Sequence, residues 1–389
     1  MTKIKIALVG AGGYGDVYMN MLRKDINNDE YILTAVIDPF IEKAPSFKYI
    51  TENNIPMYRA LEEFYANDSA ELVIISSPLT EHKRQVITAL RNGSHVLCEK
   101  PLVATVEETE EIRRVQKESG KLLGVGFQWS FSESMLSLKR DIINGVFGNP
   151  ISLRTFISWK RYDDYYESSS WKGRIKDDNG NIILDSIVTN ATSHYLHNIF
   201  FLMGEEIQSA KLPLDFRAAV YRAKNIESFD TCFLKGNFDN GASFMYAASH
   251  SGDMEDEPKC IYEFENAIVT YDGNEHFKGV RAVFKDGSEK CYGCPEHSEK
   301  LKLMLSAIRD EAEIPCTIDT IIPHLAVCNS IFRKVNITDF PETLLYHESN
   351  PAGIFVKGLH AQLLRCYMEN KLPTDLDYIW AVDETRVVL

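Results

Sequence analysis

The feature that most constrains this chain is a glycine-rich turn near its N-terminus. An apolar run of strand length, Ile4–Val9, leads into Gly10-Ala11-Gly12-Gly13-Tyr14-Gly15, and a helical pattern follows over residues 14–25. In this order, a G-x-G-x-x-G turn lets the backbone approach a pyrophosphate, which binds at the helix N-terminus. The residues expected to make that contact are Gly10, Gly12, Gly13, Tyr14 and Gly15. A glycine-rich turn without a ligand is the alternative.

The end of the second apolar run indicates which dinucleotide fits. Residues Ile32–Ile37 end at Asp38, 23 residues after Gly15. A carboxylate there accepts a hydrogen bond from a ribose 2′-hydroxyl and repels a 2′-phosphate. Lys43 is the nearest basic residue after Asp38, and no arginine stands beside it. NAD is therefore the expected cofactor, and NADP is less favoured.

Strand and helix patterns alternate over residues 1–125. Apolar runs of strand length, separated by helical periodicity at 14–25, 81–92 and 106–118, occur at Ile4–Val9, Ile32–Ile37, Leu72–Ser76, His95–Cys98 and Leu122–Val125. Such alternation indicates a doubly wound parallel sheet. Residues 1–125 are thus predicted to form an α/β Rossmann-type domain.

The pattern changes after Gly126. Runs rich in strand formers follow one another without intervening helices, as in Thr231–Phe238 and Ala242–Ser249, which flank Asp239-Asn240-Gly241, a hairpin signal. Helical patterns cover residues 133–144, 191–203, 296–312, 318–334 and 354–369. We predict an α+β domain with a mostly antiparallel open sheet over residues 126–340. Residues 341–389 are predicted to be a helical C-terminal extension that packs on the body.

Composition narrows the classes of partner. The formal net charge is −14, and no basic block occurs, which argues against a nucleic-acid partner. No apolar run approaches the roughly 20 residues that span a bilayer, and no secretory signal is visible, so a cytoplasmic protein is expected. Cys291 and Cys294 have CxxC spacing, with His297 beyond them. A zinc site would need a fourth ligand, so the prediction is a turning strand edge and no metal.

Lys100 lies where parallel sheets bind ligands. It follows His95–Cys98, at the carboxyl end of a predicted parallel strand, and Pro101 biases its backbone towards an extended conformation. An exposed loop lysine is the alternative interpretation.

The motif around Lys100 resembles a known family. The glycine turn, Ser77-Pro78 with His82, and above all Glu99-Lys100-Pro101 are similar to the glucose–fructose oxidoreductase/inositol dehydrogenase/MocA (Gfo/Idh/MocA) family. The resemblance continues through Gly124–Gln128 and Gly148–Pro150 and covers residues 3–340. It implies that Lys100 binds the hydroxyl being oxidised and helps to carry its proton. Residues that it places at the cofactor are Ser77, Pro78, His82, Glu99, Lys100 and Gln128.

A second polar group lies in the helical pattern at 191–203. Asn190, His194 and His197 recur at i, i+4 and i+7, hence on one face of an otherwise apolar helix. Such a stripe indicates a wall of a polar cavity, and satisfied core histidines are the alternative. The resemblance implies that His194 acts with the lysine, while Asn190 stands where the family usually has an aspartate. Asp185 would need a bulge to replace it.

Aromatic and charged residues alternate before this helix, at Trp159–Tyr166 and Trp171–Arg174. Aromatic faces next to hydrogen-bonding groups suit a carbohydrate, and an amphipathic surface loop is the alternative. Trp129 follows Gln128 where the family commonly has arginine, which points to an atypical substrate. The candidate substrate contacts are Trp129, Tyr162, Trp171, Lys172 and His197.

Together these features predict an NAD(P)-dependent enzyme that transfers a hydride to or from a hydroxyl-bearing carbon of a sugar, cyclitol or sugar derivative. Its alternatives are an NAD-retaining, redox-neutral glycosidase and a non-catalytic dinucleotide sensor. Apolar residues at alternate positions of Thr231–Phe238 and Ala242–Ser249 predict a subunit interface on the open sheet. A homodimer or homotetramer is expected.

Overall fold

The chain folds into two compact units. The computed structural model describes residues 2–24, 29–274, 279–295 and 298–389. Unit 1 comprises residues 1–131 and 297–319, and unit 2 comprises residues 132–296 and 320–389. Each unit is considered by itself.

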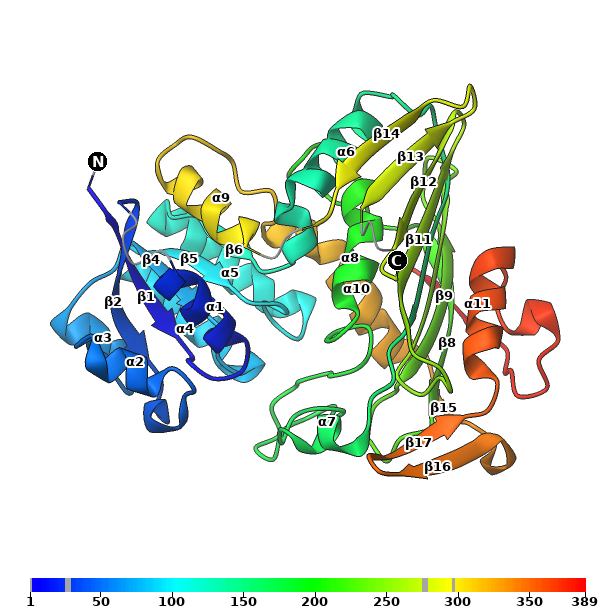
Figure 1. The fold of residues 1–389 in the computed structure, drawn as a ribbon, viewed down its shortest axis with the longest axis horizontal. Helices are drawn as coiled ribbons and strands as arrows, with labels where there is room; N and C mark the ends of the chain where they lie inside the picture. Colours follow the sequence, from blue (N-terminus) through cyan, green and yellow to red (C-terminus); the bar gives the residue numbers. More distant parts are fainter. Residues whose placement is uncertain (1, 25–28, 275–278, 296–297) are drawn as a thin grey trace. The chain divides into compact units, whose positions relative to one another are not determined.

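Unit 1 is built on a parallel sheet. Its strands are β1 (Ile4–Val9), β2 (Tyr31–Ile37), β3 (Met57–Tyr58), β4 (Leu72–Ile75), β5 (His95–Cys98) and β6 (Leu123–Val125), in the order β3-β2-β1-β4-β5-β6. Helices along it are α1 (Tyr14–Lys24), α2 (Phe47–Glu52), α3 (Leu61–Asn67), α4 (Leu79–Arg91) and α5 (Val106–Ser119) (Figure 1). The buried apolar runs form the strands because both faces of a parallel sheet are covered. The predicted Rossmann-type fold is confirmed.

A segment distant in the sequence completes this unit. Residues 297–319 belong to this unit and carry α9 (Glu299–Ile308). The sulfur atom of its buried Met304 lies 2.9 Å from where a side chain would begin on Gly124 in β6. Beside the outer strand, the Val125 N–H donates to the Cys316 carbonyl at 3.0 Å. The sequence-based division had placed these residues in the second domain, at 126–340. It was wrong here because helical periodicity does not tell which sheet a helix covers.

Unit 2 contains a long, mostly antiparallel sheet. The strands are β7 (Pro150–Ser158), β8 (Asp215–Arg222), β9 (Thr231–Asn237), β10 (Ser243–Ser249), β11 (Asp256–Phe264), β12 (Ala267–Asp272), β13 (Val280–Phe284), β14 (Glu289–Gly293), β15 (Ile337–Asp339) and β18 (Thr385–Val388). Their order is β14-β13-β12-β11-β7-β10-β9-β8-β15, and β18 pairs with β8. β10 pairs with β7 and β15 with β8 in parallel. The predicted hairpin is present as β9 and β10, with Gly241 at φ +85°.

Elements of unit 2 lie on both faces of this sheet. On one face lies α8 (Ser193–Leu202), where Phe200 packs on Phe244 of β10. On the other lie α11 (Leu359–Glu369) and the segment that follows it, as Figure 1 shows. The remaining elements are α6 (Glu133–Ile143), α7 (Asp163–Glu167), α10 (Ile318–Lys334) and the hairpin β16 (Leu345–Ser349) with β17 (Ala352–Val356).

The C-terminal residues change the expectation about assembly. Phe233 of β9 and Met245 of β10 are buried in one cluster with Leu359, Leu363 and Trp380. The apolar positions predicted to form a subunit interface are thus covered by the chain's own C-terminal segment. The prediction of an interface there was wrong, because the extension supplies the cover. The predicted helix 354–369 also begins later, at Leu359, since residues 352–356 form β17.

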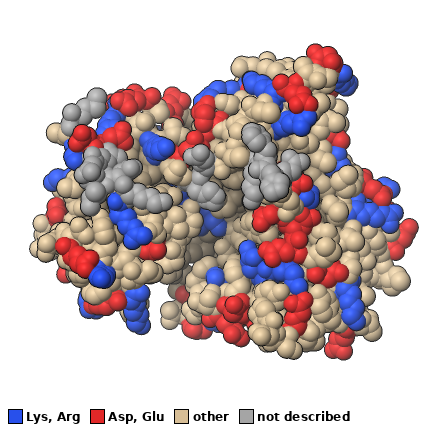
Figure 2. Space-filling model, in the orientation of Figure 1, with Lys and Arg blue, Asp and Glu red and all other residues tan. Residues whose placement is uncertain are grey.

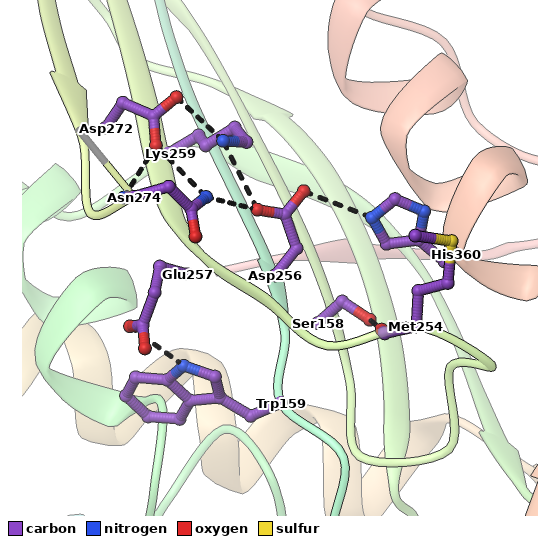
Figure 3. Close-up of polar contacts among 9 residues, drawn as sticks. All are labelled: Ser158, Trp159, Met254, Asp256, Glu257, Lys259, Asp272, Asn274 and His360. Carbon is purple, nitrogen blue, oxygen red and sulfur yellow. Dashed lines mark hydrogen bonds and ion pairs between the residues drawn. The ribbon is translucent and has the colours of Figure 1, made fainter.

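Polar contacts hold α11 next to the N-terminal end of β11, as Figure 3 shows. The His360 ring lies 3.1 Å from an Asp256 carboxylate oxygen, and Lys259 bridges Asp256 at 3.2 Å and Asp272 at 2.7 Å. The Asp253 carboxylate accepts the N–H groups of Gly358 and His360 at 2.8 and 3.0 Å. These bonds satisfy backbone donors in the first turn of α11, which the helix itself cannot do.

Charged side chains of both signs are interspersed over the face drawn in Figure 2. Among the described residues, no helix is long and apolar enough to cross a membrane. No group of three or more His, Cys, Asp or Glu residues that could hold a metal ion occurs in the same part of the chain. Cys291 and Cys294 are exposed at the end of β14, while His297 lies outside the described residues.

The packing of the C-terminal segment on the sheet of unit 2 leads to a prediction about stability. Trp380 is 7% exposed, and its ring contacts Tyr221 and Phe340 at centroid distances of 5.1 and 5.2 Å. Trp380→Ala removes this packing and should lower the free energy of unfolding by about 3–5 kcal/mol. The neighbouring Ile379 is fully exposed, so Ile379→Ala is the control and should change it by less than about 0.5 kcal/mol. Equal effects in urea denaturation would show that the cover contributes nothing.

Candidate functional site

The glycine turn has two kinds of glycine. Gly10 and Gly15 are required by the chain itself: an added Cβ would lie 2.7 Å from the Ser76 carbonyl oxygen and 2.0 Å from the Gly10 carbonyl oxygen, respectively. A Cβ on Gly12 would meet nothing within 4 Å, and the same holds for Gly13. The space above Gly12 is therefore left open by the protein, beside the first turn of α1. This fits a dinucleotide phosphate, which needs close backbone approach at a helix N-terminus.

Asp38 follows β2 and supports this turn. Its carboxylate accepts the Ala11 N–H at 2.9 Å and the Phe40 N–H at 2.8 Å. Each carboxylate oxygen has a second lone pair, so the group can also accept a ribose hydroxyl. Asp38 thus has a structural role in addition to the one predicted for it.

The ends of β4 and β5 are joined through a buried histidine. His82 Nε2 lies 2.8 Å from the Ser77 carbonyl oxygen, and Nδ1 lies 2.9 Å from that of Pro101. Burial lowers the pKa of the His82 imidazole, while the two carbonyls act in the opposite direction. The Ser77 hydroxyl donates to Gln85 at 2.5 Å. His82 therefore fixes two segments of the sheet edge by bridging their backbones.

Glu99, at the end of β5, lies in a buried polar network. One carboxylate oxygen accepts the Tyr18 hydroxyl at 2.7 Å and the ammonium group of Lys300. The other lies 3.3 Å from the Lys100 N–H. Burial, and secondarily the Glu99 charge, raises the pKa of Tyr18 well above its ordinary value. The carboxylate also lies 2.9 Å from where a side chain would begin on Gly126.

Tyr14, in the first turn of α1, extends this network to the segment after β6. Its hydroxyl donates to Gln128 at 3.1 Å and lies 3.3 Å from the Lys300 ammonium. The network thus contains three predicted cofactor residues, Tyr14, Glu99 and Gln128. Lys300 was missed by the sequence analysis, because nothing local to α9 distinguishes it from an ordinary helix lysine.

The polar stripe of unit 2 differs from the prediction. α8 begins at Ser193, so Asn190 lies in the preceding turn and only His194 and His197 lie on the helix. His197 is fully buried, stacked on Phe201 at 6.0 Å, and burial lowers its pKa well below the ordinary value. Its full burial favours the core alternative over the predicted contact with substrate. His194 is partly exposed.

Tyr165, which the sequence analysis did not single out, links several candidate residues. The Asn190 amide donates to its hydroxyl at 3.3 Å, and the Lys172 ammonium lies 4.2 Å from its ring centroid. The Arg161 guanidinium lies 5.3 Å from the same centroid. Burial lowers the pKa of Lys172, and the Asp185 charge opposes this. The aromatic and charged side chains thus form one partly exposed cluster instead of a plain surface loop.

The remaining predicted substrate residues are Tyr162, Trp171 and Trp129. The Tyr162 hydroxyl donates to Glu348 at 3.1 Å, and its ring packs on Phe355. Trp171 is partly exposed. Trp129 is buried in unit 1, which favours a core position over the predicted contact with substrate. Asp185 is buried and accepts the Gly173 N–H at 2.5 Å, so it shapes the turn after Lys172.

Comparison with known proteins identifies the first unit. The sequence profile of an oxidoreductase family with an NAD-binding Rossmann fold, Gfo/Idh/MocA, matches residues 4–127. The chain is 30% identical to scyllo-inositol 2-dehydrogenase (NADP(+)) IolU of Bacillus subtilis over 139 residues, 36% of this chain and 41% of that protein. It is 27% identical to inositol 2-dehydrogenase of Mycolicibacterium gilvum over 216 residues, 54% of this chain and 56% of that protein. The matches thus span about half the length of these curated relatives.

The fold as a whole also has solved counterparts. The WlbA dehydrogenase of Bordetella pertussis, in complex with NADH and UDP-GlcNAcA, superposes with a TM-score of 0.70. The likeness covers 85% of this chain and 96% of that one, at 20% sequence identity. It demonstrates a shared fold.

The open space at Gly12 can be tested directly. Gly12→Ala should leave the free energy of unfolding within about 0.5 kcal/mol of wild type, since the added Cβ contacts nothing in the protein. It should nevertheless weaken NAD binding by at least about tenfold in calorimetry, because a methyl group occupies the space that a phosphate needs. Gly15→Ala is the opposite control, and it should destabilise the fold because of the 2.0 Å overlap. Unchanged NAD affinity of Gly12→Ala would place the dinucleotide elsewhere.

Proposed function

Because residues 4–127 match the Gfo/Idh/MocA oxidoreductase family, we propose that the chain transfers a hydride between NAD and a hydroxyl-bearing carbon of a sugar, cyclitol or sugar derivative. The observation that carries this proposal is the open cradle above Gly12, on the unit in which Lys100 follows β5. Ligands bind at the carboxyl ends of the strands in such sheets. The curated relatives act on inositols, in agreement with a polyhydroxylated substrate.

Several residues are proposed to hold the cofactor. The backbone at Gly12 and Gly13 would receive the pyrophosphate, and the Asp38 carboxylate would accept a ribose hydroxyl. The negative charge of Asp38 favours NAD over NADP, whose 2′-phosphate it repels. His82 and Glu99 contribute by fixing the backbone around Ser77 and Lys100.

A bound nicotinamide supplies the hydride acceptor, and the chain supplies the proton chemistry. Lys100 is proposed to bind the reacting hydroxyl and to help carry its proton. A lysine ammonium group can donate a proton and the neutral amine can accept one, so this side chain could exchange a proton with a bound hydroxyl group. His194 is proposed to assist, with Asn190 where related enzymes use a carboxylate.

The cluster around Tyr165 is proposed to bind the substrate's remaining hydroxyl groups. Lys172 and Asn190 offer donors beside an aromatic face, and a sugar ring presents hydroxyls at its rim and C–H groups on its faces. Tyr162 and Trp171 lie on the same segment. Contacts to remote hydroxyls orient the reacting carbon, which is where much of the catalytic advantage arises.

Lys100→Ala tests the proposed chemistry once a sugar and cyclitol screen, read by NADH absorbance, has identified a substrate. The variant should keep its NAD affinity and lose more than ~10²-fold in turnover, since it lacks a proton-transfer group. Lys117→Ala, at an exposed lysine of the same unit, is the control and should behave as wild type. Near-normal turnover of a folded Lys100→Ala variant would contradict the role. Retention of NAD with glycoside cleavage and no net NADH would indicate the redox-neutral reaction instead.

The assembly is proposed to be a homodimer or homotetramer in the cytoplasm. Ile268 of β12 and Val283 of β13 are exposed and opposite one another in the sheet, so they form an apolar strip. We place the subunit interface on that strip. Light scattering at micromolar concentration should report an oligomer that Val283→Asp dissociates, with Ile379→Asp, at another exposed isoleucine, as the control. A monomeric wild type would refute the assembly.

A further inference from the structure

Lys300 of α9 is buried to a degree that calls for an explanation. Its side chain is 0% exposed, although charged residues are almost never fully buried unless they are paired. Its ammonium group pairs with Glu99 and lies 4.4 and 4.8 Å from the ring centroids of Tyr14 and Tyr18. Ion pair, hydroxyl and two aromatic faces together replace the water that the cation has lost.

Stability alone is a poor reason for such a pair. A well-packed apolar pair of the same volume is often as stable as a buried ion pair or more so, because both charges must be desolvated. A buried ion pair is therefore better explained by the positions in which it holds its two side chains than by a gain in stability. It is directional, and it holds the groups at its ends in one arrangement.

The groups that Lys300 holds belong to the dinucleotide site. Glu99 contacts the Lys100 N–H, and Tyr14 opens the helix whose N-terminus faces the glycine turn. Tyr14 also bonds to Gln128, so one ammonium group is connected with the segments after β1, β5 and β6. These three segments lie at the carboxyl edge of the sheet.

We propose that Lys300 is a positioning residue of the cofactor site, which by binding Glu99 and Tyr14 sets the backbone of the glycine turn and of Lys100 before a dinucleotide binds. This inference rests on the proposed function. The same pair balances the negative charge of Glu99 with the positive charge of Lys300. Lys300 acts through these residues and does not itself touch the cofactor.

The test uses the full-length protein and measures NAD affinity by calorimetry. Lys300→Met should weaken NAD binding by at least about tenfold, since it leaves a buried carboxylate unpaired next to the site. Glu99→Gln combined with Lys300→Met removes both charges and should recover most of the lost affinity. Tyr14→Phe, which keeps the fold and deletes the hydroxyl, should weaken binding by about threefold.

The matched control is Arg309→Gln. Arg309 lies on the same returning segment and donates to the Glu30 carbonyl at 2.9 Å, before β2 and thus at the opposite edge of the sheet. This variant should loosen the attachment of the segment and leave NAD affinity unchanged. Hydrogen exchange of the NAD-free protein supplies a readout that needs no cofactor: Lys300→Met should speed exchange at residues 10–18 and 100, and Arg309→Gln should not.

Two results would overturn the inference. One is NAD affinity of folded Lys300→Met within about twofold of wild type. The other is an equal loss in Arg309→Gln, which would make the effect one of general stability. If Lys300→Met does not fold, the double variant and Tyr14→Phe decide. A double variant that binds NAD at least about tenfold more weakly than wild type, or a Tyr14→Phe variant that binds NAD as tightly as wild type, would refute positioning. A wild-type protein that binds no NAD would instead refute the proposed function, which separates the two failures.

Discussion

The buried carboxylate of Glu99 is the constraint on which the dinucleotide unit depends. A charge at the end of a buried strand must be neutralised. Here the cation is Lys300, about two hundred residues after Glu99 in the sequence. The segment that carries it also covers β6 and bonds beside its edge through Cys316. Unit 1 therefore cannot be completed by its first 131 residues, although these contain the whole parallel sheet.

Unit 2 also depends on distant segments of the chain, but there they bury an apolar surface and not a charge. One face of the long sheet is covered by α8 and part of the other by α11 and the residues around Trp380. The residues that α11 covers would otherwise form an apolar surface suited to association. The C-terminal extension buries these residues of β9 and β10 within the chain itself. The exposed residues Ile268 and Val283 lie on other strands, β12 and β13.

The glycine turn, the hairpin at Asn240-Gly241 and the strand before Lys100 were predicted correctly because each depends on neighbours in the sequence. The surroundings of other residues could not be predicted, because they depend on distant parts of the chain. His194 and His197 are both histidines of α8, yet they differ in burial. His197 packs on Phe201 inside the core, whereas His194 is partly exposed. Trp129 had an aromatic character that suits a sugar, and it is buried beside β6. Asn190 was placed on a helix that begins three residues later.

The sequence by itself indicated five of the six strands and three of the helices (α1, α4 and α5) in the first domain, the glycine turn between β1 and α1, and the position of Lys100 at the end of a parallel strand. It did not reveal β3, α2 or α3. The features that it indicated follow from hydrophobic periodicity and from backbone sterics, which act over a few residues. Only the tertiary structure decided that Lys300 pairs with Glu99, that Tyr165 gathers Asn190 and Lys172, and that residues 341–389 cover the second sheet. The physical reason is that the burial of a charge or an apolar face can be satisfied by any suitable group in the chain. Which group it is depends on packing between segments far apart in the sequence, and local pattern carries no information about that choice.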